Sequence, residues 1–140
     1  MSESRSERIL IADDEPNILI SLEYLMKREG YEVHVARDGQ EALDLLQRVL
    51  PRLVLLDVMM PNKNGFEVCQ ALRADESLKD TLVLMLTAKG RDTDIAKGLG
   101  VGADAYMTKP FSTKELVVKV REMLAAPRGA GPAADGGAAS

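Results

Sequence analysis

The sequence predicts an α/β fold in which five helices cover both faces of a five-stranded parallel sheet. Short apolar runs alternate along the chain with longer amphipathic segments, which is typical of strands buried between helices. Proline, glycine and capping residues mark the borders between these segments. A regular alternation of strands and helices gives a parallel sheet with covering helices. The expected strands span residues 9–12, 33–36, 53–56, 82–86 and 105–108.

The first half of the chain contains two strands, each followed by a helix. Residues 9–12 form a continuous apolar run, and the next helix begins near Pro16, whose fixed φ suits a first turn. Gly30 ends this helix. Its apolar face is formed by Ile18, Leu22 and Leu25. After the second strand, residues 38–41 (Asp-Gly-Gln-Glu) have the spacing of a capping box and predict a second helix, which Pro51 stops.

The second half of the chain repeats this pattern three times. A buried run leads directly into Asp57, and a helix over residues 66–74 follows after a loop. The next strand ends at Thr87 and precedes a less apolar helix over residues 92–100. A capping box at residues 112–115 (Ser-Thr-Lys-Glu) predicts the start of the last helix.

The composition indicates one globular domain with polar ends. Hydrophobic residues make up 46% and charged residues 29%, which suits a single sizeable core. We expect a polar lead at residues 1–7, a folded domain at 8–126 and a disordered Gly/Ala/Pro tail or linker at 127–140. The formal net charge of -4 argues against direct nucleic acid binding by this domain. The single cysteine, Cys69, allows no internal disulfide, and we interpret it as a small apolar residue of a helix.

The apolar segments are all short. None of them reaches the roughly 18 residues that a membrane span needs. The first residues are polar and charged and do not have the apolar segment of a signal peptide. We therefore expect a cytoplasmic protein that does not enter a membrane.

Polar residues follow four of the five predicted strands. Asp13 and Asp14 follow the first strand, Asp57 the third, Thr87 the fourth and Lys109 the fifth. Because ligand sites of parallel sheets form at the carboxyl ends of the strands, we expect these side chains to converge at one edge. Three clustered carboxylates repel one another unless a hard cation lies among them.

Magnesium fits this cluster best, because it prefers oxygen ligands, keeps several waters and binds phosphate oxygens. Calcium fits less well, since the sequence has no closely spaced run of oxygen ligands. Zinc is disfavoured because His34 and Cys69 do not complete a softer ligand set. Beside Asp57, Lys109 could bind an arriving phosphoryl group and Thr87 could donate a hydrogen bond to it. A nucleophile, a metal and a cationic clamp are the parts that phosphoryl transfer requires.

Six sequence blocks, in a fixed order between about residue 8 and residue 124, resemble those of a known family. The blocks are Ile-Leu-Ile-Ala-Asp13-Asp14-Glu15, Leu-Val-Leu-Leu-Asp57-Val-Met-Met-Pro61, Gly65-Phe-Glu67, Leu-Met-Leu-Thr87-Ala88, Gly102-Ala-Asp104-Ala-Tyr106 and Lys109-Pro110-Phe111. Together they make the chain similar to the receiver domain of two-component response regulators. The agreement of independent blocks makes this resemblance specific.

The resemblance implies a role for each residue of the site. Asp57 would accept a phosphoryl group from a phosphohistidine of a sensor histidine kinase or a phosphotransfer protein. Magnesium, with manganese as a substitute, would be held by Asp57, directly by Asp14, through water by Asp13 and by the carbonyl of Met59. The residues that would bind the phosphoryl group are Thr87, Ala88 and Lys109.

The resemblance also implies a fold and an output surface. The fold would be a flavodoxin-like three-layer sandwich with strand order 2-1-3-4-5, and Pro110 matches a cis-proline position. Thr87 and Tyr106 would form a switch pair that, on phosphorylation, changes the face made by the fourth helix, the fifth strand and the fifth helix. The protein target at that face and the cognate kinase are not identified by the sequence.

Four residues depart from common patterns of this family. Met59 and Lys89 occupy positions that tune the access of water to the phosphoryl group, and neither is suited to orienting an attacking water. We therefore expect slow self-dephosphorylation. Ala105 and Lys119 stand where receivers joined to winged-helix domains carry a dimer-forming acid and arginine. This weakens the case for that dimer, and a phosphorylation-dependent homodimer stays open.

Several alternatives remain. The protein could be a stand-alone switch, a phosphorelay intermediate or the N-terminal receiver fragment of a multidomain transcriptional regulator. A magnesium hydrolase is disfavoured, because Val58 and Met59 supply no second catalytic acid, so we expect no metabolic enzyme. A receiver that signals without phosphorylation is disfavoured, because such a receiver would lack an acid-pocket residue and this sequence lacks none. A flavin-binding protein of the same fold is disfavoured because the acids after the first strand would repel a flavin phosphate.

Overall fold

A computed structural model describes residues 7–88 and 92–125 of the chain. It contains the five strands and five helices that the sequence predicts, with a short 3-10 turn after the third helix. The elements are β1 (Arg8–Ala12), α1 (Pro16–Arg28), β2 (Glu32–Ala36), α2 (Gly39–Val49), β3 (Leu53–Asp57), α3 (Gly65–Arg73), η2 (Glu76–Leu78), β4 (Leu82–Ala88), α4 (Asp92–Gly100), β5 (Ala105–Lys109) and α5 (Thr113–Ala125).

Two of the segments expected from composition fall largely outside the structure. The tail expected at residues 127–140 lies outside the described residues, as does the polar lead expected at 1–7 except for Glu7. No helix within the described ranges is both long and apolar enough to span a membrane.

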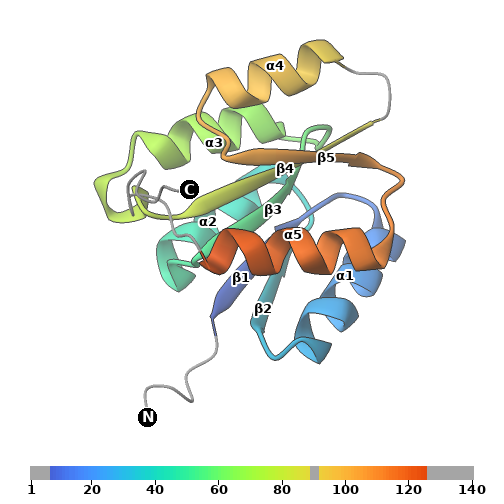
Figure 1. The fold of residues 1–140 in the computed structure, drawn as a ribbon. Coiled ribbons are helices and arrows are strands. Elements are labelled where there is room, and N and C mark those ends of the chain that lie inside the picture. Colours follow the sequence, from blue (N-terminus) through green and yellow to red (C-terminus); the bar gives the residue numbers. More distant parts are fainter. Residues whose placement is uncertain (1–6, 89–91, 126–140) are drawn as a thin grey trace.

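The sheet is parallel throughout and its strands lie in the order β2-β1-β3-β4-β5. Helices α1 and α5 cover one face, and α2, α3 and α4 cover the other (Figure 1). The three-layer arrangement and the strand order implied by the family resemblance are confirmed. Each crossover through a helix returns the chain in the same direction, so all strands end at the same edge of the sheet.

The sheet separates two apolar clusters. In β3 all five residues are buried: Leu53 and Leu55 pack toward α1 and α5, whereas Val54 and Leu56 pack toward α2 and α3. Successive side chains of a strand point to opposite faces, so a strand covered on both faces needs an unbroken apolar run. This is the physical reason that the strands could be located from the sequence.

The helices begin at capping residues, with one difference from the prediction. Asp38 accepts a hydrogen bond from the backbone N–H of Glu41 at 2.8 Å. The carboxylate of Glu41 accepts from the backbone N–H of Arg37 rather than from that of Asp38, so the predicted box is only half formed. The predicted box between Ser112 and Glu115 forms in both directions. A further box, not predicted, begins α3.

The apolar face of α1 is centred one residue away from the predicted one. Leu19, Leu22 and Met26 are buried, while Ile18 and Leu25 lie at the flanks of the contact. All five are apolar, and all five contact the cluster under α1 and α5. The sequence pattern alone therefore could not fix the rotation of the helix.

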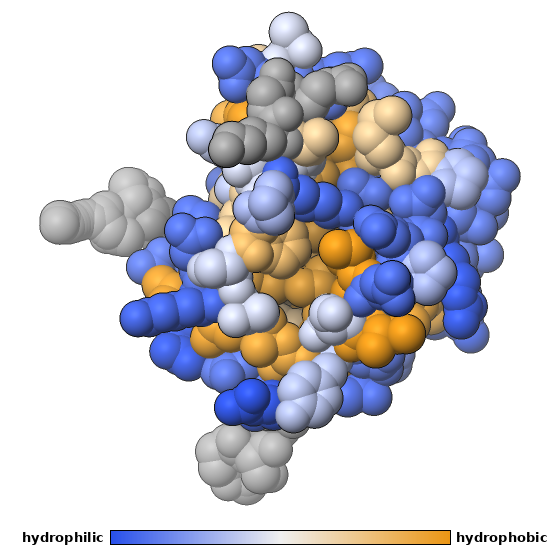
Figure 2. Space-filling model, turned by 90° about the vertical axis from the view of Figure 1, so that its right-hand side faces the viewer, coloured by the Kyte–Doolittle hydropathy of each residue, from blue (hydrophilic) through white to orange (hydrophobic). Residues whose placement is uncertain are grey.

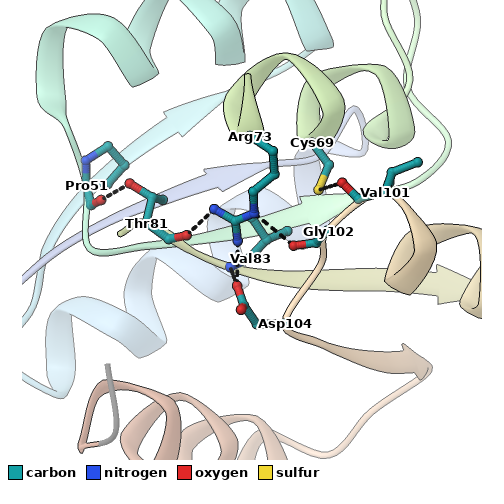
Figure 3. Close-up of polar contacts among 8 residues, drawn as sticks. All are labelled: Pro51, Cys69, Arg73, Thr81, Val83, Val101, Gly102 and Asp104. Atoms are coloured by element: carbon teal, nitrogen blue, oxygen red, sulfur yellow. Dashed lines mark hydrogen bonds and ion pairs between the residues drawn. The ribbon is translucent and has the colours of Figure 1, made fainter. Parts of the chain in front are cut away.

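A partly buried ion pair, with side chains 14% and 16% exposed, joins three segments on the α3 side of the sheet (Figure 3). The Arg73 guanidinium lies 2.6 Å from the Asp104 carboxylate and also donates to the carbonyls of Gly102 and Thr81. Asp104 in turn accepts from the backbone N–H of Val83 at 2.8 Å. These contacts tie the end of α3 and the start of β4 to the connection between α4 and β5.

Two further contacts hold the connection between α4 and β5. Gly102 has a φ of 111°, which a residue with a side chain rarely adopts, and it closes the end of α4. The buried Cys69 lies on α3, and its Sγ donates to the carbonyl of Val101 at 3.7 Å. This agrees with the interpretation of Cys69 as a packed helix residue.

We expect Arg73→Met to lower the free energy of unfolding by about 2–3 kcal/mol, because it leaves the partly buried Asp104 carboxylate without its cation. The matched control is Arg121→Met, which removes an arginine that pairs with Glu29 at the surface, where its side chain is 64% exposed. This change should cost about 1 kcal/mol or less. Urea unfolding measures both, and equal losses would contradict the assignment.

Candidate functional site

The predicted polar residues lie at the edge where the strands end. Asp57 is the last residue of β3, Lys109 is the last of β5, and Thr87 is next to last in β4. Asp13 and Asp14 directly follow β1. Figure 2 looks onto this side of the molecule and shows hydrophobic side chains enclosed by hydrophilic ones. Residues from four separate segments therefore meet at one edge, as the topology predicts.

Three carboxylates form the centre of the site. Asp13, Asp14 and Asp57 each place an oxygen within 4.8 Å of the others. Asp13 is fully buried and Asp57 is 5% exposed, whereas Asp14 is exposed. The cluster is thus closed on the protein side and open to solvent at Asp14.

One ammonium group lies between the two buried carboxylates. Lys109 Nζ is 2.8 Å from Asp13 Oδ2 and 3.3 Å from Asp57 Oδ1. Asp13 also accepts from the backbone N–H of Glu15 at 2.9 Å, and Asp57 accepts from that of Met59 at 3.4 Å. The shorter distance makes Asp13 the firmer partner of Lys109.

Strand alternation explains why these side chains meet. Leu53, Leu55 and Asp57 lie on one face of β3, and Ala105, Met107 and Lys109 lie on one face of β5. The apolar members of both rows belong to the cluster under α1 and α5. Each row ends in a charged residue at the sheet edge. The charged site therefore lies directly beside the apolar core, on the same face of the sheet.

The charges of the site shift its proton equilibria. Burial and then the nearby Asp13 carboxylate raise the pKa of Asp57 to about 6, and Lys109 only partly opposes this shift. Burial by itself acts to lower the pKa of Lys109, but the hydrogen bond to Asp13 and the charges of Asp57 and Asp13 outweigh it, so that pKa is raised. The ammonium therefore stays charged at neutral pH, while the carboxylate of Asp57 is destabilised.

A divalent cation fits this donor set. Three carboxylates and one ammonium leave a net charge of about -2 when all are ionised. Carboxylate oxygens with one open side are the ligands that Mg²⁺ prefers, and the solvent-exposed side at Asp14 leaves room for water. The acidic cluster is of the kind that binds Mg²⁺.

The predicted switch residues Thr87 and Tyr106 differ in their surroundings. Thr87 is 2% exposed, and within the described part of the chain its Oγ1 has no hydrogen-bond partner. Tyr106 is 43% exposed. In the sheet register, Met85 lies beside Tyr106 and Thr87 beside Thr108, so Thr87 and Tyr106 share one face. The Thr87 hydroxyl is thus available to donate a hydrogen bond to a group at this edge of the sheet.

The remaining predicted residues differ in their position and exposure. The Met59 side chain is 60% exposed, and Ala88 is exposed at the end of β4, beside Lys109 in the register. The peptide bond between Lys109 and Pro110 is cis, as the resemblance implies. Lys89 lies outside the described residues. His34 is at the surface, with its Nε2 2.8 Å from Glu32, and takes no part in the site.

Sequence reasoning missed the support on the α3 side of Asp57. Gly65 begins α3 directly against the end of β3, where an added Cβ would lie 2.5 Å from the carbonyl oxygen of Asp57. Its backbone N–H donates to the carbonyl of Val58 at 2.9 Å. The sequence signal was a glycine between a loop and a helix, and glycines occur at such borders in many proteins without a contact of this kind.

Comparison with known proteins identifies the family. The family model described as response regulator receiver domain matches residues 9–121. A candidate response regulator from Chloroflexus aurantiacus has 36% sequence identity, covering 86% of this chain and 99% of that one, with a TM-score of 0.83. The chemotaxis protein CheY4 of Vibrio cholerae has 32% identity, covering 84% and 98%, with a TM-score of 0.80.

A third similar structure contains a metal. It is the receiver domain of a sensor histidine kinase from Pseudomonas aeruginosa, with a magnesium ion coordinated in its active-site cleft. Its identity is 26%, covering 86% of this chain and 99% of that one, with a TM-score of 0.80. The present chain belongs to the response regulator receiver domain family of two-component systems. Members of this family are phosphoacceptor switches rather than metabolic enzymes.

We expect the Asp57 carboxylate to lower the stability of the metal-free protein as the pH rises. The pKa of Asp57 is about 6 in the folded protein and ordinarily 3.8. The free energy that protonated Asp57 contributes to folding is therefore fully present below about pH 4 and is lost as the pH rises through about 6. Asp57→Asn removes this loss, on the order of 3 kcal/mol at about pH 7. Urea unfolding in EDTA measures it. A difference between wild type and variant that does not change with pH would contradict the expectation.

Proposed function

We propose that the protein is a phosphorylation-activated signalling switch in the cytoplasm and that Asp57 accepts the phosphoryl group. The observation that carries this proposal is the position of Lys109 Nζ between Asp13 and Asp57 in a three-carboxylate cluster. A cation that already contacts the nucleophile can bind a phosphoryl oxygen once the carboxylate oxygen has formed its bond to phosphorus. The donor would be a sensor histidine kinase or a phosphotransfer protein.

In the proposed reaction, an Asp57 oxygen attacks the phosphorus of a phosphohistidine. The P–N bond breaks, an acyl phosphate forms on Asp57, and the imidazole leaves with the electron pair of that bond and takes up a proton. Asp13, Asp14, Asp57 and the Met59 carbonyl would hold Mg²⁺, which would stabilise the charge on the phosphoryl oxygens. The remaining oxygens would be bound by Thr87, Ala88 and Lys109.

The firm bond of Lys109 to Asp13 supports this role. The 3.3 Å contact to Asp57 is long for a charged hydrogen bond and can be exchanged, whereas the 2.8 Å contact to Asp13 can persist. The ammonium would therefore remain in place while it changes one partner. Thr87 supplies a buried hydroxyl that can donate to the new group.

The output would pass through Thr87 and Tyr106 to the face of α4, β5 and α5. A groove of about 660 Å³ runs between β5 and α5 beside Tyr106. Inward rotation of the exposed Tyr106 ring would change the wall of this groove, so a protein target could distinguish the two states. Ala105 and Lys119 do not supply the acid and arginine of the winged-helix type of dimer.

The phosphoacceptor is tested by intact-mass measurement after incubation with acetyl phosphate and Mg²⁺. We expect one added phosphoryl group in the wild-type protein and none in Asp57→Asn or when EDTA replaces Mg²⁺. Labelling that persists in Asp57→Asn would refute the assignment. Release of many phosphate ions per protein molecule would instead indicate a hydrolase.

We expect Met59→Asn to shorten the lifetime of the phosphoryl group by about fivefold. One added hydrogen bond to an attacking water contributes about 1 kcal/mol to the transition state, which corresponds to that factor. The control is Leu50→Asn, an exposed apolar position with a φ of 51° that asparagine accepts. Phosphoryl decay followed by mass spectrometry distinguishes the two, and an unchanged decay in Met59→Asn would count against the proposed role of Met59.

A further inference from the structure

The loop between β3 and α3 has a fixed shape. At its base, the backbone N–H of Gly65 donates to the carbonyl of Val58 at 2.9 Å. At its tip, the backbone N–H of Lys63 donates to the carbonyl of Pro61 at 2.8 Å, and Asn62 between them has a φ of 69°. An N–H bonded to the carbonyl two residues earlier, around a positive φ, is a γ-turn. The loop is thus closed at both ends.

The tip of this loop rests on the first residue of α2. The backbone N–H of Gly39 points to the carbonyl of Pro61 at 3.4 Å. A Cβ added to Gly39 would lie 1.9 Å from the carbonyl oxygen of Lys63 and 2.6 Å from its Cβ. Because the nearest atom belongs to the backbone, no change of side-chain rotamer could relieve this overlap. Gly39 does not have a positive φ, so the glycine is needed here for space.

The loop, and not α2, would give way if a side chain were added. Ala42 and Leu46 of α2 are fully buried against the sheet, and Asp38 caps the helix. In contrast, Pro61 and Asn62 are exposed. A well-packed helix resists displacement more than an exposed turn does. An added methyl group would therefore push the tip outward.

We propose that Gly39 is a positioning residue for the metal site, because α2 supports the loop that carries Met59 through direct backbone contact at Gly39. Met59 and the buried Met60 connect Asp57 to this tip, so we expect a displaced tip to shift both residues and with them the Met59 carbonyl relative to the carboxylates. This inference rests on the proposed function, in which that carbonyl is a ligand. It assigns a role to a segment that has no atom in the acidic cluster.

The effect is expected on metal affinity. Changes in residues that only support metal ligands typically lower affinity 10- to 100-fold, and we expect Gly39→Ala to weaken Mg²⁺ binding by roughly 10-fold. Gly100→Ala is the matched control. Gly100 has no positive φ, and among the described residues nothing outside its own helix and chain neighbours lies within 4 Å of an added Cβ. It should bind Mg²⁺ as the wild-type protein does.

The experiment is a Mg²⁺ titration of wild type, Gly39→Ala and Gly100→Ala by calorimetry, at a temperature where circular dichroism shows each protein to be folded. Affinity of Gly39→Ala within twofold of wild type would overturn the proposal, whatever its melting temperature. A wild-type protein that binds no Mg²⁺ would instead refute the proposed function. The two failures are therefore distinguishable.

A second measurement does not depend on the folding of the variant. In the wild-type protein, NMR amide signals followed during the same Mg²⁺ titration should shift for Met59, Lys63 and Gly39 with one common affinity. The amide of Gly100 should not shift with them. Shifts at Met59 without any at Gly39 would show that the loop is not coupled to α2, and would also overturn the proposal.

Discussion

A single ammonium group holds the site together. Lys109 Nζ bonds residues that are 96 and 52 positions away in the sequence. Because β4 lies between β5 and β3, the lysine side chain extends across a strand to reach Asp57, over a strand-to-strand distance of about 10 Å. Without this cation, two buried carboxylates would face each other in an apolar setting. The parallel sheet, with all its strands ending at one edge, is what makes the contact geometrically accessible.

The sequence was sufficient for the order of elements and for the residues at the sheet edge. Unbroken apolar runs located the strands, and Asp57 and Lys109 followed from their position at strand ends. The roles of individual residues in metal and phosphoryl binding stay predictions. Two details could not be predicted. Several apolar residues of α1 could equally face the sheet, and the carboxylate of Glu41 could accept from the backbone N–H of Arg37 as easily as from that of Asp38. The contact of Gly39 with Lys63 joins two segments that no local pattern relates.

The connection that follows α4 is held by side-chain contacts, and α4 itself has few buried residues. Its end is fixed by Arg73, which binds the connection into β5, and within the described residues 92–100 only Gly98 is buried. The other four helices each bury more residues than α4 does. A helix with one buried residue has few core contacts to hold it against the sheet. The connection after α4 is therefore fixed by α3, whereas α4 itself is packed less closely than its neighbours.

The separation of the core into two clusters has an evolutionary consequence. The outer surfaces of α1 and α5 can exchange residues without disturbing the α2 and α3 layer, because the sheet stands between them. The support of Asp57 by Gly65, and of the neighbouring loop by Gly39, belongs to that second layer. The side chains of Asp57 and Lys109 lie on the α1 and α5 side of the sheet, but the backbone of Asp57 is supported from the α3 side, so a gene duplicate could change the exposed surface of α1 while inheriting that support. Divergence of partners and retention of chemistry would then be under separate selection within one small fold.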